Sequence, residues 1–222
     1  MTLATYPSYK NFDALIDVER LAALDCFIKE RIRYRGGNSH DLRFFTGPFL
    51  RDDSAPTVPG PQMVYLSRAR GPDDYYKLDD PDYWEPSEAV HEFAPLMDFI
   101  ETLPFAAKGR MLIIYDESGR AVPAHRDHDS HDLCHEFIWF RTNLDKPFYM
   151  LEPNSGKKLY VESHAAWFDT VNQFHGADAS GHLSVSIRVD GIFSNELRRL
   201  IPFPDANRAA APSIWAASET VG

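Results

Sequence analysis

His125 and Asp127 are the residues of this 222-residue chain whose types and spacing most directly suggest metal chemistry. On a β-strand, side chains at positions i and i+2 point to the same side, so an imidazole and a carboxylate spaced in this way can reach one ion. Such a pair is expected about once by chance in a chain with 9 histidines and 33 acidic residues. The metal prediction therefore depends on residues further along the chain.

The supporting residues lie downstream of this pair. His175 follows the segment 166–174 and is the candidate third ligand, in preference to His164, which is expected in a turn. Arg188 lies in the segment 183–190, whose polar and apolar residues alternate. If that segment is a strand, one of its faces comprises Ser184, Ser186, Arg188 and Asp190. A polar face on such an apolar strand indicates that this face borders a cavity accessible to water.

Short strands are the elements expected to position these residues. From residue 110 onward, apolar runs alternate with turns rich in Asn, Asp, Ser and Gly. The predicted strands are 111–115, 136–143, 147–151, 158–162, 166–171 and 183–193. Strands of this length, separated by frequent turns, favour a sandwich or a barrel.

Helices and a long irregular region precede the strands. One amphipathic helix is predicted from Asn11 or Asp13 to about residue 35, and a second over 87–103. Between them, prolines are interleaved with aromatic residues, apart from a short strand expected at 62–67. Ordered loops of this kind often line a binding site, so substrate specificity is expected here.

A single domain is predicted for residues 1–222. Within it, 1–104 is expected to form a helical and loop-rich covering region, 105–193 the β core, and 194–222 a short helix and tail.

Composition narrows the possible functions. The chain has 33 acidic and 23 basic residues and a net charge of −10, which disfavours broad binding to nucleic acid. It contains neither an apolar run of the roughly 18 residues that a membrane helix needs nor a recognisable secretory signal. Only Cys26 and Cys134 are available for disulfides. A cytoplasmic enzyme without a membrane or nucleic-acid partner is therefore expected.

The order of the two histidines, the aspartate and Arg188 resembles that of the Fe(II)- and 2-oxoglutarate-dependent dioxygenases. The resemblance covers roughly 110–193. Within that superfamily, the segments 122–127 and 167–175 are most similar to the aspartyl/asparaginyl β-hydroxylases and the small proline hydroxylases. The resemblance implies a mainly β fold with flanking α-helices, in which a double-stranded β-helix (jelly-roll or cupin-like) core follows N-terminal helices.

The resemblance also implies a role for each candidate residue. The implied catalytic residues, which are also the metal ligands, are His125, Asp127 and His175. They would bind Fe(II) on one face and leave positions for 2-oxoglutarate and O2. Arg188 is implied to pair with the distal carboxylate of 2-oxoglutarate, assisted by Ser186. Arg141 is open to two interpretations: it could anchor a carboxylate of cosubstrate or substrate, or pair with a structural acid such as Glu136 or Asp169.

The function implied in this way is hydroxylation or desaturation of a small molecule, such as an amino acid, an amino-acid derivative or a natural-product intermediate. Asp127 speaks against the related halogenases, which lack the carboxylate ligand. The alternatives are a cosubstrate-independent metal enzyme on the same barrel, either a dioxygenase or an isomerase, and a non-catalytic small-molecule-binding barrel. A zinc pair formed by His131 and His135 is a further, weaker alternative.

Overall fold

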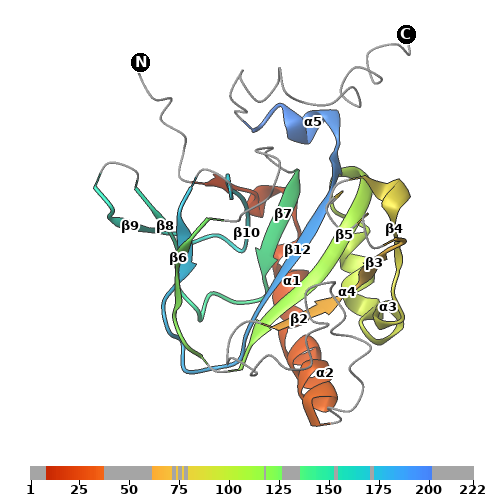
Figure 1. The fold of residues 1–222 in the computed structure, drawn as a ribbon, viewed down its shortest axis with the longest axis horizontal. Helices are drawn as coiled ribbons and strands as arrows, with labels where there is room; N and C mark the ends of the chain where they lie inside the picture. The colour runs from red at the N-terminus through yellow and green to blue at the C-terminus, as the bar shows by residue number, and fades with distance from the viewer. Residues whose placement is uncertain are drawn as a thin grey trace.

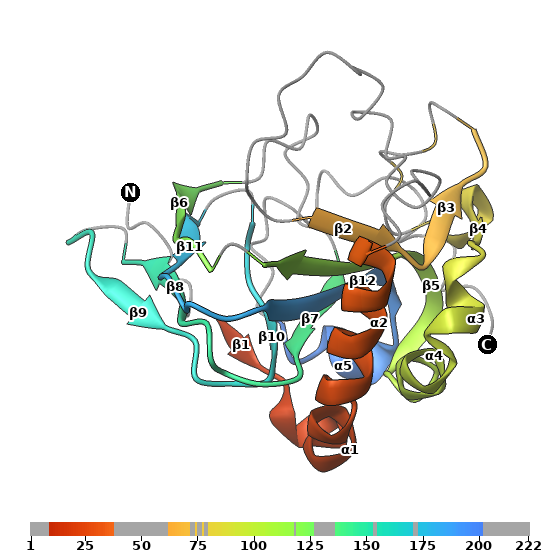
Figure 2. The ribbon, with the colours of Figure 1, turned by 90° about the horizontal axis from the view of Figure 1, so that it is seen from below.

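The computed structural model describes residues 9–37, 62–71, 74, 77, 80–117, 119–126, 136–152, 155–170 and 173–201. Within these ranges, two antiparallel sheets lie against each other, and helices cover one of them (Figures 1 and 2). None of the helices in the described ranges is long and apolar enough to cross a membrane.

Six strands form the larger sheet, in the order β1-β10-β7-β12-β5-β2. Their bounds are β1 Lys10–Asn11, β2 Gln62–Tyr65, β5 Phe105–Asp116, β7 Phe137–Arg141, β10 Ala165–Trp167 and β12 Ser184–Phe193. The smaller sheet has the order β6-β11-β8-β9. Its strands are β6 Val122–His125, β8 Phe148–Leu151, β9 Lys158–Tyr160 and β11 His175–Ala177. A separate hairpin joins β3 (Ser67–Ala69) to β4 (Trp84–Pro86).

The chain passes back and forth between the two sheets from β5 to β12. In the larger sheet β12 lies between β5 and β7, and in the smaller sheet β11 lies between β6 and β8. Strands that are distant in sequence thus become neighbours, which is the jelly-roll order of a double-stranded β-helix. This confirms the predicted mainly β fold with a double-stranded β-helix core and N-terminal helices. The edges of the larger sheet are β1 and β2, which come from the predicted covering region.

The helices are shorter than the sequence pattern indicated. The bounds are η1 Asp13–Leu15, α1 Val18–Ala23, α2 Asp25–Gly37, η4 Pro81–Tyr83, α3 Ala89–Glu92, α4 Ala94–Ile100 and α5 Asn195–Arg198. The expectation of one helix from residue 13 to 35 was wrong, because the chain turns at Leu24, whose N–H donates to the Leu21 carbonyl at 3.1 Å. The second expected helix divides at Phe93. Pro95, in the first turn of α4, has no N–H with which to continue a helix from α3.

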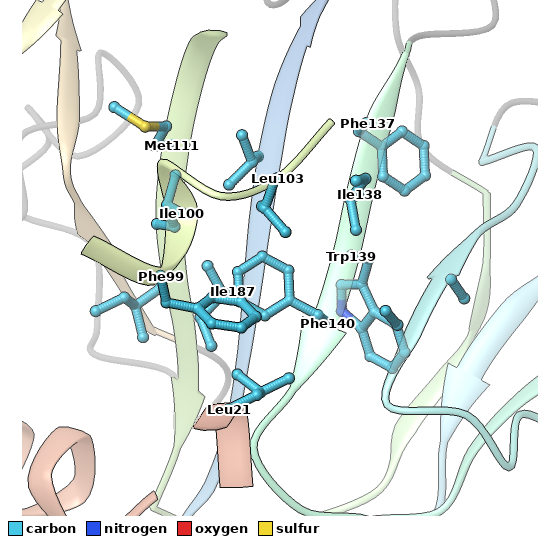
Figure 3. Packing of buried hydrophobic residues seen from close by; sticks show 14 of the residues in the cluster. Leu21, Phe99, Ile100, Leu103, Met111, Phe137, Ile138, Trp139, Phe140 and Ile187 are labelled. Atoms are coloured by element: carbon cyan, nitrogen blue, oxygen red, sulfur yellow. The ribbon is translucent and has the colours of Figure 1, made fainter. Parts of the chain in front are cut away.

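The helices bury the outer face of the larger sheet. The Phe99 ring of α4 packs on Phe140 of β7, with ring centroids 5.5 Å apart. Figure 3 shows these rings beside Ile187 of β12 and Leu21 of α1, which are both fully buried. Because side chains alternate along each strand, the residues that fill this hydrophobic layer leave their neighbours pointing to the other sheet. The inner face of the larger sheet is therefore available to line a cavity.

Gly191 of β12 lies at a β-bulge, where the backbone of β5 approaches closely. A Cβ at this position would be 2.3 Å from the Ala107 carbonyl oxygen, which cannot move aside as a flexible side chain can. We expect Gly191→Ala to lower the free energy of unfolding by about 1–3 kcal/mol. Thermal denaturation measures the loss. Gly156→Ala is the comparison: its Cβ meets no atom within 4 Å, although its φ is +66°. If Gly191→Ala proves no less stable than Gly156→Ala, close backbone approach is not the constraint at Gly191.

Candidate functional site

A cavity of about 400 Å³ lies between the two sheets. The larger sheet contributes lining residues from β5, β7 and β12, and the smaller sheet contributes them from β6, β8 and β11. Its polar and charged lining comprises Arg110, Asp116, His125, Arg141, Lys146, Thr170, His175, Ser184, Ser186 and Arg188. The alternating polar face predicted for 183–190 thus faces this cavity from Ser184 to Arg188.

The two candidate ligand histidines lie next to each other. His125 is the last residue of β6 and His175 is the first of β11, and the two are direct partners in the antiparallel pairing of these strands. Their ring centroids are 4.5 Å apart. His175 is buried and His125 is exposed, so the pair lies where the cavity reaches the surface.

Backbone carbonyls orient both imidazoles. The Nδ1 atom of His125 lies 2.9 Å from the Pro123 carbonyl oxygen, and that of His175 lies 3.2 Å from the Gln173 carbonyl oxygen. A carbonyl oxygen only accepts hydrogen bonds, so Nδ1 is the donor in each ring, and a neutral imidazole with this contact has its lone pair on Nε2. An imidazole that donates its other N–H to a carbonyl is typical of histidines that bind a metal. As neutral imidazoles, both rings would therefore have the tautomer of a metal ligand, with Nε2 free of the carbonyl contact.

The third predicted ligand, Asp127, lies outside the described residues, as do His131 and His135 of the zinc alternative. Within the described ranges, no group of three or more His, Cys, Asp or Glu residues is placed to hold a metal ion. His164 lies outside the cavity lining, and its Nδ1 is 3.0 Å from the Arg141 carbonyl oxygen. The structure thus brings together two of the three predicted ligands, and the complete triad stays a prediction.

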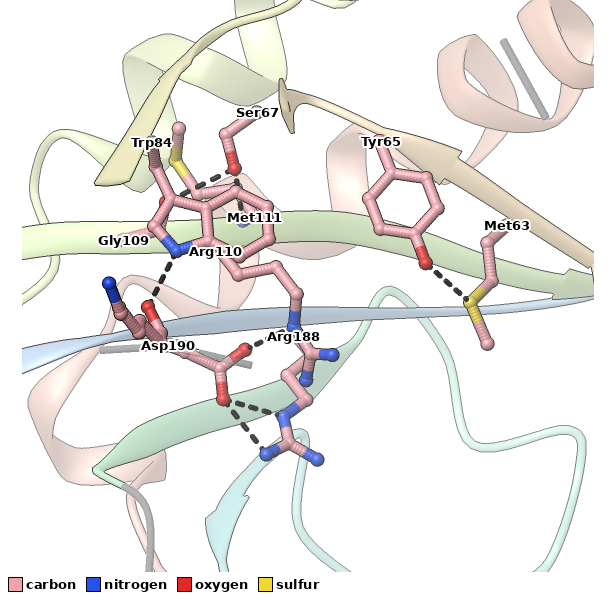
Figure 4. Close-up of polar contacts among 10 residues, drawn as sticks. Met63, Tyr65, Ser67, Trp84, Gly109, Arg110, Met111, Arg188 and Asp190 are labelled. Carbon is pink, nitrogen blue, oxygen red and sulfur yellow. Dashed lines mark hydrogen bonds and ion pairs between the residues drawn. The ribbon is translucent and has the colours of Figure 1, made fainter. Parts of the chain in front are cut away.

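Arg188 belongs to a charged cluster on the inner face of the larger sheet (Figure 4). Its Nε donates to Oδ1 of Asp190 at 2.8 Å, and Nη2 lies 2.8 Å from the same oxygen. Arg110 of β5 donates from Nε to Oδ2 of Asp190 at 2.9 Å. The Arg188 guanidinium also lies over the Phe137 ring, 4.1 Å from its centroid. The ion pair with Asp190 and the contact with the Phe137 ring together orient the guanidinium.

The guanidinium of Arg141 donates to the protein's own backbone. Nη1 donates to the Lys146 carbonyl at 3.0 Å, and Nη2 donates to the carbonyls of Val161 at 2.6 Å and Ser163 at 2.9 Å. Burial lowers the pKa of Arg141 to about 10, so the group is still charged at neutral pH. These bonds pin the loops that flank β8 and β9.

The two acids offered as structural partners of Arg141 have other contacts. Glu136 accepts from Nε of Arg198 at 2.7 Å and from the Phe193 N–H at 2.8 Å, which ties α5 to the start of β7. The backbone of Asp169 forms part of the turn before β11: its carbonyl accepts from the Gln173 N–H at 2.9 Å, and its N–H donates to Oε1 of Gln173 at 3.1 Å. The sequence provided no indication that carbonyls would replace these acids as partners of Arg141.

A second ion pair lines the cavity near the end of β5, and sequence reasoning missed it. Lys146 Nζ lies 2.5 Å from Oδ2 of Asp116, and both side chains are largely buried. Lys146 lies in the loop between β7 and β8, where nothing in the sequence distinguishes it from a surface lysine. Histidines aside, the described residues that line or contact the cavity include four cationic side chains, Arg110, Arg141, Lys146 and Arg188, and two carboxylates, Asp116 and Asp190. Among these described residues, positive charge is in excess, which favours an anion.

Aromatic side chains form the wall beside the histidines. The rings of Phe148 and Phe168 have centroids 5.8 and 5.3 Å from that of His175, and Phe168 also packs edge-on against Trp139. All three aromatic residues line the cavity. In contrast, Phe174 is 44% exposed and lies beneath the Arg126 guanidinium. Among the described residues, aromatic rings therefore form much of the cavity wall beside the two histidines.

Of the aromatic residues interleaved with prolines between the two predicted helices, Tyr75 and Tyr76 lie outside the described residues. Trp84 is buried, and its indole N–H donates to the Lys77 carbonyl at 2.7 Å. Trp84 therefore packs within the covering region.

No family model matches the chain, and no curated protein matches it significantly. Solved structures that resemble it include a prolyl-4-hydroxylase from Pseudomonas putida, with 15% identity over 86% of this chain and 95% of that one and a TM-score of 0.46. Another is a prolyl hydroxylase from Trichoplax adhaerens in complex with a hypoxia inducible factor peptide fragment. It has 12% identity over 87% of this chain and 86% of that one, and a TM-score of 0.47. A third is an oxidoreductase of the 2OG-Fe(II) oxygenase family from Burkholderia pseudomallei, at 9% identity, 61% and 71% coverage, and a TM-score of 0.38. These neighbours are similar in fold at low sequence identity.

Proposed function

We propose that this protein is an Fe(II)- and 2-oxoglutarate-dependent oxygenase that hydroxylates or desaturates a small molecule. One observation carries the proposal: a pair of histidines in the ligand tautomer and a fixed arginine on the opposite sheet line the same cavity. A metal and an anionic cosubstrate could therefore meet in one enclosed space.

The residues at the mouth of the cavity fit a divalent metal. His125 and His175 offer two neutral imidazoles from neighbouring strands, and the carbonyls of Pro123 and Gln173 hold both rings in orientation. Asp127, two positions after His125, would supply the carboxylate of a two-histidine, one-carboxylate set. Iron bound there would couple the decarboxylation of 2-oxoglutarate by O2 to oxidation of a substrate C–H bond, with succinate and CO2 as co-products.

Arg188 would bind the distal carboxylate of 2-oxoglutarate. Its guanidinium is fixed by Asp190 and Phe137, so little conformational entropy is lost when a carboxylate binds. Ser186, two residues earlier on the same face of β12, also lines the cavity and would donate a hydroxyl hydrogen bond. The excess positive charge of the cavity suits a dianionic cosubstrate. Arg188 is a better partner for the distal carboxylate than Arg141, because three backbone carbonyls already accept hydrogen bonds from the Arg141 guanidinium.

The wall of aromatic residues would exclude bulk water from the reacting atoms. Phe148 and Phe168 lie against His175, and Trp139 packs against both of these rings, so a substrate held here would be shielded on the protein side. A cavity of about 400 Å³ has the size of a small-molecule site. This supports a small substrate, such as an amino acid, an amino-acid derivative or a natural-product intermediate.

The fixed Arg188 also separates this proposal from a metal enzyme without a cosubstrate. Such an enzyme has no need of a buried guanidinium aimed into the cavity, and a non-catalytic barrel has no need of paired imidazoles in the ligand tautomer. The first alternative therefore does not explain Arg188, and the second does not explain the paired histidines.

The test is anaerobic addition of Fe(II) and 2-oxoglutarate, followed by a search for the weak visible charge-transfer band of the chelate. We expect the band with wild-type protein and its absence with His175→Ala. Screening a substrate library for succinate release then identifies the substrate class. The proposal is wrong if wild-type protein shows neither result: no charge-transfer band with Fe(II) and 2-oxoglutarate, and no succinate release that depends on 2-oxoglutarate.

A further inference from the structure

Arg126 and Phe174, here called the outer pair, are immediate neighbours of the two candidate ligand histidines. Arg126 follows His125 in the chain, and Phe174 precedes His175. The Arg126 guanidinium lies 4.8 Å from the centroid of the Phe174 ring. Neither residue lines the cavity, and both are exposed. Because neighbouring side chains point to opposite faces of a strand, the outer pair lies on the solvent side of the sheet whose cavity side carries the histidines.

The contact within the outer pair joins the two segments that carry the histidines. His125 and His175 are direct partners in the antiparallel pairing of β6 with β11. Continued by one residue beyond the ends of both strands, this register sets Arg126 opposite Phe174. A contact between directly opposite side chains stabilises the pairing of two strands. The outer pair therefore fastens the end of β6 at which His125 lies.

The opposite side of β11 is held regularly by β8. Each residue of β11 has a partner in β8, and the Leu151 N–H donates to the Phe174 carbonyl at 2.8 Å. On the outer face, a Cβ at Gly176 would lie 2.7 Å from the Tyr149 hydroxyl oxygen, so β8 packs closely across β11. The backbone that carries Phe174 and His175 is thus fixed from this side.

The pairing of β6 with β11 is irregular in comparison. Between the two register pairs of these strands, β6 has two residues, Pro123 and Ala124, opposite Gly176 of β11, which forms a β-bulge. Pro123, Ala124 and His125 are all exposed, so burial does little to fix the register of β6. The position of His125 relative to His175 therefore depends on contacts besides the strand pairing, and the outer pair supplies one.

We propose that Arg126 and Phe174 are positioning residues for the metal site, because their contact holds β6 against β11 and so sets the spacing of the two imidazoles. This inference rests on the proposed function, since it takes His125 and His175 as ligands of a divalent metal. Arg126 is also the residue from which the chain continues to Asp127, the third predicted ligand.

The opposing interpretation is that the arginine and the ring meet only as exposed neighbours. The two interpretations differ in how the effects of two substitutions combine. If the contact positions the ligands, removing the ring weakens metal binding only while the arginine is present. Charge alone predicts the opposite direction for the arginine, because removal of a cation near a metal dication strengthens metal binding.

The experiment is titration of the apo-protein with Co(II), followed by the visible absorption of the bound ion. Phe174→Leu leaves the charge unchanged and should weaken Co(II) binding by about 2- to 5-fold, the range expected of an exposed cation–π contact. In the Arg126→Met protein, the same substitution should have no further effect. The absorption bands, which depend on ligand geometry, should change in Phe174→Leu. Phe174→Tyr keeps the ring and should restore both the bands and the affinity.

Arg31→Met is the matched control. The Arg31 guanidinium lies 5.6 Å from the centroid of the Phe27 ring, so this substitution removes a similar contact on α2, outside the cavity lining. It should leave Co(II) affinity and the absorption bands unchanged. Circular dichroism of each apo-protein verifies that the variants are folded, which is expected because Arg126 and Phe174 are exposed.

Three results overturn the inference: Phe174→Leu binds Co(II) as wild type does, it loses the same affinity with and without Arg126, or Arg31→Met weakens binding equally. Failure of the proposed function gives a different result. Wild-type protein would then bind Co(II) no better than His175→Ala, and the inference would be lost with the metal site.

Discussion

His175→Ala is expected to abolish iron-dependent turnover while the barrel stays folded. His175 is half of the paired imidazole site, and even changes to residues behind a metal ligand typically cost 10- to 100-fold, so loss of the ligand itself should exceed about 100-fold. The same result is expected for His125→Ala and for Asp127→Ala. The fold should survive because strand pairing and the hydrophobic layer hold β11, rather than a metal. Iron content, succinate release and circular dichroism are the measurements.

His164→Ala is the control for this prediction, because His164 contacts the Arg141 carbonyl and lies outside the cavity lining. It should keep its iron and its turnover. If instead His164→Ala lost activity while His175→Ala kept it, the third ligand would have been assigned to the wrong histidine. Loss of activity on changing His131 and His135 together, with His125 dispensable, would favour the zinc alternative.

Arg188→Met is expected to weaken the affinity for 2-oxoglutarate by roughly 30- to several-thousand-fold. Truncating one partner of a buried charge pair costs on the order of 2 to 5 kcal/mol, and methionine offers no hydrogen bond to a carboxylate. Iron binding should persist, because Arg188 is not a ligand in the proposed site. The measurements are metal content and the 2-oxoglutarate concentration that gives half-maximal succinate release.

Arg141→Met provides the comparison. Its guanidinium donates to the carbonyls of Lys146, Val161 and Ser163, so its loss should lower stability more than cosubstrate affinity. The assignment would be reversed if Arg188→Met bound 2-oxoglutarate normally and Arg141→Met did not.

Local patterns predicted β5, β7, β8, β9, β10 and β12 within the core, although not β6 or β11. Alternation over 183–190 predicted β12 and its polar face, because strand geometry sends every second side chain to the same side. The same rule failed for β11, since the three residues from His175 to Ala177 show no alternation. Pairing with β6 and β8 on both sides makes this segment a strand.

By itself, the sequence determined the mainly β core, the N-terminal helices and the residue types available for a metal and an anion. Only the tertiary structure decided which of these residues meet. It places His125 beside His175. It also shows that Arg141 donates to backbone carbonyls and that Arg110 and Arg188 both bind the carboxylate of Asp190. The physical reason is that the direction of a side chain is a local property of its strand. Its partner depends on strand order, register and bulges, which arise from pairing between segments far apart in the chain.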